Sequence, residues 1–152
     1  MAKKTKARRE GARKRRAYIF LPHTADAKFR AFGKTLEERF ANAALAMMSI
    51  MFEPGKIKPK VKKKIFVKGA DIKALLYNWL EEFLFLRDSK FFILGSVKKI
   101  AIKKAKKGYA LSATVAGDIL DSKYEVVGPD VKAATYQEME IADKYVQVVV
   151  DI

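Results

Sequence analysis

The chain has 152 residues, half of them hydrophobic, a size and composition typical of one globular domain with a sizeable core. It contains no cysteine, which excludes disulfides and thiolate metal sites. No apolar run reaches the roughly 20 residues needed to span a membrane, and the N-terminus lacks the hydrophobic segment of a secretory signal. We therefore expect a cytoplasmic protein.

Of the net charge of +15, +8 lies in residues 1–17, which hold nine Lys or Arg and one acid. We interpret residues 1–17 as a basic, disordered tail that precedes a single domain over residues 18–152. A basic arm on a basic domain suits a polyanion, and RNA is the natural candidate. The alternative is a solubilising arm that binds without sequence specificity. The candidate RNA-binding residues of the tail are Arg8, Arg9, Arg13, Lys14, Arg15 and Arg16.

Two short strands, Tyr18–Phe20 and Ala27–Phe32, are predicted directly after the tail. Thr35 and Glu38 then fit a capping box, in which Thr35 accepts from the Glu38 N–H while Glu38 reaches back to the Thr35 N–H. The helix that follows, through residue 51, has apolar residues at helical spacing. Its methionines are interpreted as core residues.

The segment Val61–Lys68 alternates lysines with aliphatic residues, which predicts a strand with one wet, positive face. Asp71 is the predicted N-cap of a second helix. A broad apolar stripe runs along this helix, and Trp79 is expected in the core rather than on the surface as a stacking platform.

From Lys90 onward the pattern changes to strands. Hairpin turns are predicted at residues 106–108 and 142–144. Because two helices come early and strands dominate late, we predict an α+β fold, a single compact domain with two helices packed on a largely antiparallel sheet. The predicted late strands are Phe91–Val97, Lys98–Ile102, Tyr109–Val115, Val131–Ile141 and Tyr145–Val150.

The sequence contains no phosphate-binding glycine loop, no zinc motif and no nucleophile elbow. A site for a hard cation is the remaining chemical hypothesis, because calcium and magnesium prefer oxygen ligands. Asp26, Asp151 and the terminal carboxylate of Ile152 would supply them if the last strand lies beside the first, and three anionic groups held together need a cation. The alternative is that Asp26 caps a turn and that residues 151–152 fray.

Four further residues are candidates for a supporting or interface role. His23 is the only histidine, and its alternative is a structural ring bonded to backbone. Asp118 and Asp121 would add to an acidic site or form an Asx turn. Lys132 would meet a phosphate or is an ordinary lysine of a strand that faces solvent.

The chain resembles the archease family over residues 18–152. Each motif is weak alone, whereas their joint order and spacing are specific. The matching segments are His23-Thr24-Ala25-Asp26, Gly33-Lys34-Thr35-Leu36-Glu37-Glu38, Asn42-Ala43-Ala44-Leu45-Ala46, Leu75-Leu76-Tyr77-Asn78-Trp79-Leu80-Glu81-Glu82, Gly117-Asp118 through Asp121, Val131-Lys132-Ala133-Ala134-Thr135-Tyr136 and Val150-Asp151-Ile152.

This resemblance implies a non-catalytic activator of the RtcB-type RNA ligase, which joins tRNA exon halves with GTP and a divalent metal. The activator would promote guanylylation of the ligase and so permit multiple turnover. The resemblance also implies a divalent cation on Asp26, Asp151 and Ile152, with calcium first and magnesium or manganese as alternatives. Lys132 matches a lysine of the family's strand motif and is a candidate contact with the ligase.

Two positions depart from the family pattern: Gln137 and Glu125 stand where or near where the family has histidines. The roles of those imidazoles are therefore not carried over to this chain. Two rival functions remain open. One is a general RNA-binding or chaperone-like module that uses the tail and the lysine face of Val61–Lys68, and the other is an independent metal-dependent enzyme, for which no nucleophile–base pair is visible.

Overall fold

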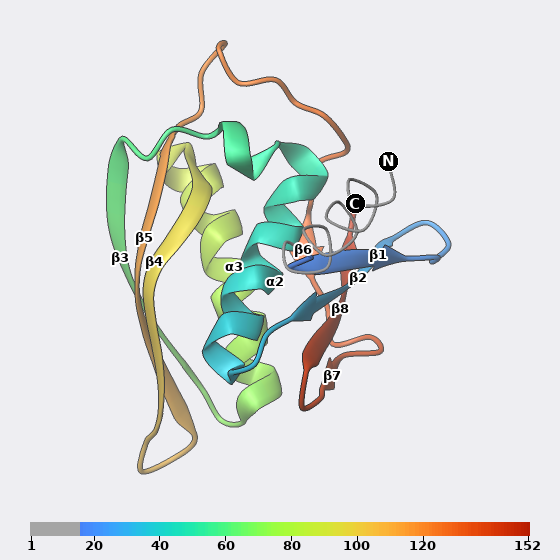
Figure 1. Ribbon diagram of the computed structural model, residues 1–152, viewed down its shortest axis with the longest axis vertical. Coiled ribbons are helices and arrows are strands. Elements are labelled where there is room, and N and C mark those ends of the chain that lie inside the picture. The colour runs from blue at the N-terminus through green and yellow to red at the C-terminus, as the bar shows by residue number, and fades with distance from the viewer. Residues whose placement is uncertain (1–15) are drawn as a thin grey trace, which may run out of the picture.

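The computed structural model describes residues 16–152, which form two helices, one short 3-10 helix and two antiparallel sheets (Figure 1). The predicted α+β class is confirmed, although the strands divide into two sheets rather than one. The elements are β1 (Tyr18–Leu21), β2 (Ala27–Phe32), α2 (Leu36–Met51), η1 (Pro54–Lys56), β3 (Val61–Gly69), α3 (Ile72–Lys90), β4 (Phe92–Lys104), β5 (Tyr109–Ile119), β6 (Ala133–Ala134), β7 (Glu140–Ile141) and β8 (Tyr145–Asp151).

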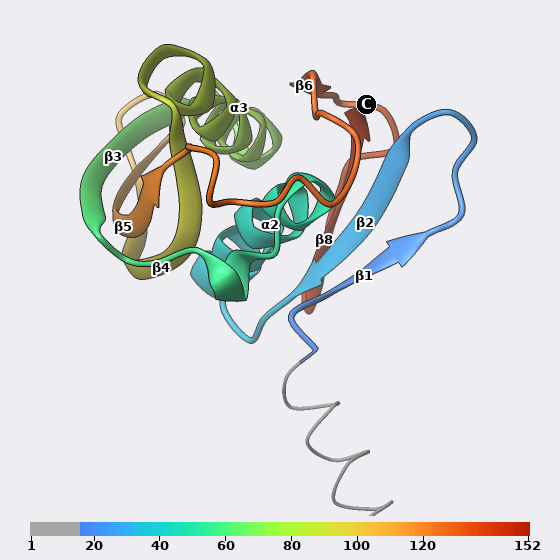
Figure 2. The ribbon, with the colours of Figure 1, turned by 90° about the horizontal axis from the view of Figure 1, so that it is seen from above.

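The two helices lie between the two sheets, as Figures 1 and 2 show. The five-stranded sheet has the order β1-β2-β8-β6, with β7 also pairing with β8, and the three-stranded sheet has the order β3-β5-β4. Both helices contact both sheets: α2 contacts β1, β2, β8 and β4, and α3 contacts β3, β4, β5, β6 and β7. Each sheet therefore turns one face toward the helices and leaves the other for ligands or solvent.

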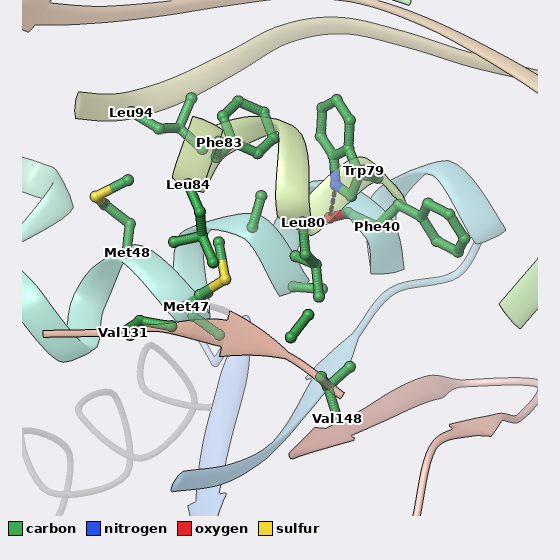
Figure 3. Packing of buried hydrophobic residues seen from close by; sticks show 14 of the residues in the cluster. Phe40, Met47, Met48, Trp79, Leu80, Phe83, Leu84, Leu94, Val131 and Val148 are labelled. Atoms are coloured by element: carbon green, nitrogen blue, oxygen red, sulfur yellow. Dashed lines mark hydrogen bonds between the residues drawn. The ribbon is translucent and has the colours of Figure 1, made fainter. Parts of the chain in front are cut away.

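The core is built where the helices meet the inner sheet faces (Figure 3). The Trp79 side chain is fully buried, and its Nε1–H donates a hydrogen bond of 2.8 Å to the main-chain oxygen of Phe40. This bond joins α3 to α2 and satisfies the polar atom of a buried indole. Met47 and Met48 are also fully buried, which confirms that the methionines are core residues.

Both helices begin at the predicted caps. The Thr35 Oγ1 accepts from the Glu38 N–H at 3.1 Å, and Asp71 Oδ1 accepts from the Ala74 N–H at 2.8 Å. The Glu38 carboxylate reaches back to the N–H of Lys34 at 2.9 Å, one residue before the position that a capping box predicts.

Both predicted hairpin turns are present. The β4–β5 turn is closed by a bond from the Ala105 N–H to the Gly108 oxygen, and the β7–β8 turn by one from the Ala142 N–H to the Tyr145 oxygen. Gly108 has a φ of 93°, a left-handed conformation that glycine adopts at low cost.

Two predicted strand boundaries are wrong. The break before Lys98 does not exist, because β4 runs through this region and absorbs the irregular pattern in register shifts at 94/96 and 97/99. The segment Val131–Ile141 is not one strand. It forms the two-residue strands β6 and β7, and between them a turn is closed by the Met139 N–H and the Tyr136 oxygen at 3.2 Å.

Within residues 16–152, no helix has the length and apolar character needed to cross a membrane.

Candidate functional site

The candidate site forms where β2 begins and β8 ends. The two strands are antiparallel, with Ala27 opposite Val150. This pair is the last of the ladder. Asp26 directly precedes Ala27, and Asp151 and Ile152 directly follow Val150, so these residues adjoin the same end of the strand pair. The last strand thus lies beside β2 rather than beside the first strand β1, and the two segments converge because Asp26 directly precedes β2.

Strand β6 holds Asp151 from the other side. Ala133 pairs with Asp151, and the Lys132 N–H donates to the Asp151 main-chain oxygen at 2.8 Å. The Lys132 side chain is exposed beside this contact. Asp151 is therefore paired with β6, one residue beyond the last β2 pair at Val150, which fixes the backbone that carries the carboxylate.

His23 lies between two carboxylates. Its Nε2 is 2.9 Å from Oε2 of Glu138, and its Nδ1 is 3.8 Å from Oδ2 of Asp26. Because a carboxylate only accepts, Nε2 must donate to Glu138, and the neutral ring then has its lone pair on Nδ1. This Nδ1 is buried and has no hydrogen-bond partner among the described residues.

Glu138 is the central positioning group of the site. The hydrogen bond from His23, followed by the charge of Lys28, lowers the pKa of the Glu138 carboxyl below its ordinary value. The Lys28 Nζ lies 3.5 Å from Oε1. Gln147 of β8 donates from Nε2 to the Glu138 main-chain oxygen at 2.7 Å, and Arg30 of β2 donates from Nε to Oε1 of Gln147 at 2.9 Å. Residues of β2 and β8 thus hold the loop that orients His23.

The backbone of the site is strained at two positions. Ala25 has a φ of 66° and Glu138 a φ of 51°, and the left-handed region is costly for residues with a Cβ. Such outliers persist where surrounding contacts over-determine them, and they cluster at functional sites. Both outliers adjoin the polar contacts of His23.

The donor set determines what the site can hold. Among residues 16–152, no group of three or more His, Cys, Asp and Glu side chains is arranged to bind a metal ion. The predicted cation ligands include only two such side chains, Asp26 and Asp151. The third predicted ligand is the main-chain carboxylate of Ile152, which is not a side chain. Carboxylate oxygens suit hard cations, and the imidazole nitrogen would suit manganese or zinc better than calcium.

Asp118 and Asp121 lie elsewhere, at the end of β5 in the other sheet. The Asp121 Oδ1 accepts from the Lys123 N–H at 2.9 Å. Asp121 therefore forms an Asx turn, the second of the two roles predicted for it. Asp118 is 5% exposed and accepts from the Tyr124 hydroxyl and from the Ile119 N–H. The structure therefore groups these acids with Tyr124 and Lys123, not with Asp26.

The remaining sequence candidates occupy the surface. Gln137 is exposed in the β6–β7 loop, and Glu125 is exposed in the loop after β5. Arg16 is exposed before β1. The other predicted RNA-binding residues, Arg8, Arg9, Arg13, Lys14 and Arg15, lie outside the described residues.

Sequence reasoning missed Glu138 and Lys28. Glu138 is separated from its partner His23 by 115 residues and follows no recognisable motif. The sequence carried one indirect signal, because a histidine with a single carboxylate neighbour still needs a partner for its second nitrogen.

The fold and the site define a small α+β protein whose polar centre combines carboxylates with one imidazole. Residues 18–152 match the archease protein family, and the chain belongs to this family.

Individual relatives agree with this assignment. The chain is 39% identical to protein archease of Methanosarcina barkeri over 139 residues, which cover 89% of this chain and 95% of the relative. It is 39% identical to protein archease of Pyrobaculum calidifontis over 145 residues, covering 92% and 98%. The solution structure of protein 1598 of Methanobacterium thermoautotrophicum is similar with a TM-score of 0.75 and 32% identity, covering 90% of this chain and 99% of that protein.

Proposed function

We propose that this protein is a non-catalytic activator of an RtcB-type RNA ligase in tRNA splicing, and that it promotes transfer of GMP from GTP to the active-site histidine of the ligase. Membership of the archease family supports a protein cofactor of RNA processing. The structural observation that supports the finer proposal is the β2–β8 register, which ends at the Ala27–Val150 pair, directly beside Asp26 and Asp151.

The proposed site takes a divalent cation on Asp26, Asp151 and the carboxylate of Ile152, with calcium first and magnesium or manganese as alternatives. Two features of the chain fit this group. Carboxylates at the same end of a strand pair repel each other when they are held close together, and a cation between them removes this repulsion. The unbonded Nδ1 of His23 also lies beside Asp26, as expected for a polar atom that lacks its ligand. A bound cation would supply positive charge for the phosphates of GTP.

The residues of the chain have separate roles in this proposal. Glu138 fixes the His23 ring through Nε2, so Nδ1 stays directed toward Asp26. The β6 pair at Asp151 and the β2 pair at the neighbouring Val150 hold this residue in place. The exposed Lys132 beside Asp151 is the candidate contact with the ligase.

The test is guanylylation of the cognate ligase by labelled GTP, with this protein added at substoichiometric amounts. Asp26→Asn removes one charge and keeps the shape of the side chain, and we expect it to abolish the stimulation. Asp143→Asn is the matched control, because Asp143 is exposed in the turn at the opposite end of β8. Equal stimulation by the wild type and by Asp26→Asn would overturn the proposal.

Calorimetric titration of the isolated protein with calcium, and then with manganese, tests the cation without the ligase. The wild type and Asp143→Asn should bind with the same affinity, and Asp26→Asn should bind at least tenfold more weakly. Extending the chain by two residues beyond Ile152 should weaken binding similarly, because it removes the terminal carboxylate from its place.

A further inference from the structure

The outward face of the three-stranded sheet has a regular pattern of side chains. Lys64 of β3 and Lys99 of β4 both pair with Thr114 of the central strand β5. Directly paired residues of antiparallel strands share one face of the sheet. Two residues along, Phe66 and Ala101 both pair with Ser112.

The next row repeats the first, with Lys68 and Lys103 both paired with Ala110. An aromatic row therefore lies between two rows that carry a lysine on each side. We call this surface the lysine face. It consists of Lys64, Phe66, Lys68, Lys99 and Lys103, with Ala110, Ser112 and Thr114 as its floor.

The charge of the lysine face is uncompensated. Its four lysines are exposed, and within residues 16–152 none of them forms an ion pair with an acid. None of the positions that make up the face holds an acidic residue. Lysines that lie in rows across a sheet repel one another, so the face suits a polyanion that neutralises several of them at once.

The shape of the face suits a base as well as phosphates. Small side chains on β5 leave a groove of about 520 Å³ between the flanking strands, and Phe66, Lys64 and Lys99 are among its walls. The Phe66 ring is 62% exposed in the middle of β3, and the Lys68 Nζ lies 5.7 Å from its centroid. Proteins that bind single-stranded nucleic acids combine an exposed aromatic ring with cations around it, because every base can stack on a ring.

We propose that the lysine face binds single-stranded RNA, with a base stacked on Phe66 and phosphates on the lysine rows. The face lies on the far side of the helix layer from the sheet that carries His23 and Asp26 (Figure 2). Contact with RNA therefore leaves the candidate site free. The proposal does not depend on the proposed ligase activation, because RNA binding is measured without the ligase.

The experiment is fluorescence anisotropy of the full chain with a labelled unstructured RNA of about 15 nucleotides, at several salt concentrations. Phe66→Leu should raise the Kd about tenfold and leave the salt slope unchanged, because it removes a stacking ring and no charge. The double variant Lys64→Gln/Lys99→Gln should make the negative slope of log K against log salt less steep by roughly 1.4, since two phosphates lose their lysines. The basic tail is present in every variant and contributes equally.

The matched control is Lys34→Gln/Lys144→Gln, which removes the same charge from two exposed lysines at one end of the other sheet, where the Gly33 N–H donates to the Lys144 oxygen. This control loses only the non-specific attraction that the removed net charge supplies. Its affinity for the RNA should therefore be at least threefold higher than that of Lys64→Gln/Lys99→Gln. A duplex of the same length should bind independently of Phe66, because its bases are not free to stack.

The proposal is overturned if Phe66→Leu binds single-stranded RNA as the wild type does, or if the two lysine pairs have equal effects. Loss of ligase binding by Phe66→Leu with RNA binding intact would identify a protein-docking face instead and would also overturn it.

Discussion

The candidate site and the lysine face are built in opposite ways. The site gathers His23, Asp26, Glu138 and Asp151 from segments far apart in the sequence, and two of its backbone positions have left-handed φ values. The lysine face consists of strand positions on the uninterrupted β3–β5 ladder and on the part of β4 from Lys99 onward, which follows its register shifts. The candidate site is formed by strand ends and loops, whereas the lysine face is formed by every second residue of neighbouring strands.

This difference determines how each region responds to change. The site depends on a few side-chain contacts, such as that between His23 and Glu138, so single conservative substitutions should alter its chemistry. The lysine face depends on summed charge and one ring, so its effects should be graded and sensitive to salt. Both regions share the helix layer between the sheets.

The largest expected effect is therefore the loss of that shared layer. Trp79→Ala should lower the free energy of unfolding by about 3–5 kcal/mol, because it empties a buried volume and leaves the Phe40 oxygen without its donor. Urea denaturation followed by circular dichroism measures this. Phe85→Ala is the control on the same helix, since Phe85 is 61% exposed and its loss should change stability by no more than about 0.5 kcal/mol. Equal costs would contradict the assigned core.

A smaller effect is expected where the regular sheet ends, at Asp118. The Tyr124 hydroxyl, followed by the Ile119 N–H, lowers the pKa of the Asp118 carboxyl below its ordinary value. A lowered pKa in the folded state stabilises the fold above the ordinary aspartate pKa of about 4, and this contribution is lost as the pH falls through the folded-state pKa.

Asp118→Asn should therefore lower the urea midpoint at pH 7, and the difference from the wild type should shrink progressively below about pH 4. Asp121→Asn is the control, because Asp121 is exposed and its Asx turn survives with an amide oxygen. A difference between Asp118→Asn and the wild type that stays constant from pH 7 to pH 3 would show that the charge of Asp118 is not involved.

The smallest expected effect compares the backbones of the two regions directly. Ala25→Gly should raise the free energy of unfolding by about 0.5–1 kcal/mol, because glycine relieves the left-handed strain at a φ of 66°. Ala101→Gly, at a regular position of β4 on the same face as Phe66, should lower it by a similar amount. Two changes of the same sign, measured by urea denaturation, would contradict the assigned difference between the regions.

The sequence predicted those features that local physics determines. Helix starts at Thr35 and Asp71, the core position of Trp79 and the glycine turn at residue 108 follow from capping, periodicity and backbone freedom. Strand patterns also lead up to Asp26 and to the chain end, whereas the pairing of β8 with β2 rather than with β1 depends on tertiary contacts.

The remaining features depend on tertiary contacts that no local pattern records. The loop between β6 and β7 has alternating residues, yet Glu138 turns out of the strand conformation to bond His23 and Gln147. The left-handed conformation of Glu138 explains both why the predicted strand Val131–Ile141 is interrupted and why His23 has a partner that the sequence did not predict. Likewise, the bulges of β4 look like a break in sequence, because a register shift disturbs alternation without ending the strand.

The most direct test of the account separates the two regions in one measurement: the rate of ligase guanylylation by labelled GTP in the absence of RNA. We expect Lys64→Gln/Lys99→Gln to stimulate this step as the wild type does, and Asp26→Asn to give no stimulation. This result would place activation at the ends of β2 and β8. Full stimulation by Asp26→Asn, with loss of stimulation by the lysine variant, would contradict the account, because activation would then depend on the opposite face of the molecule.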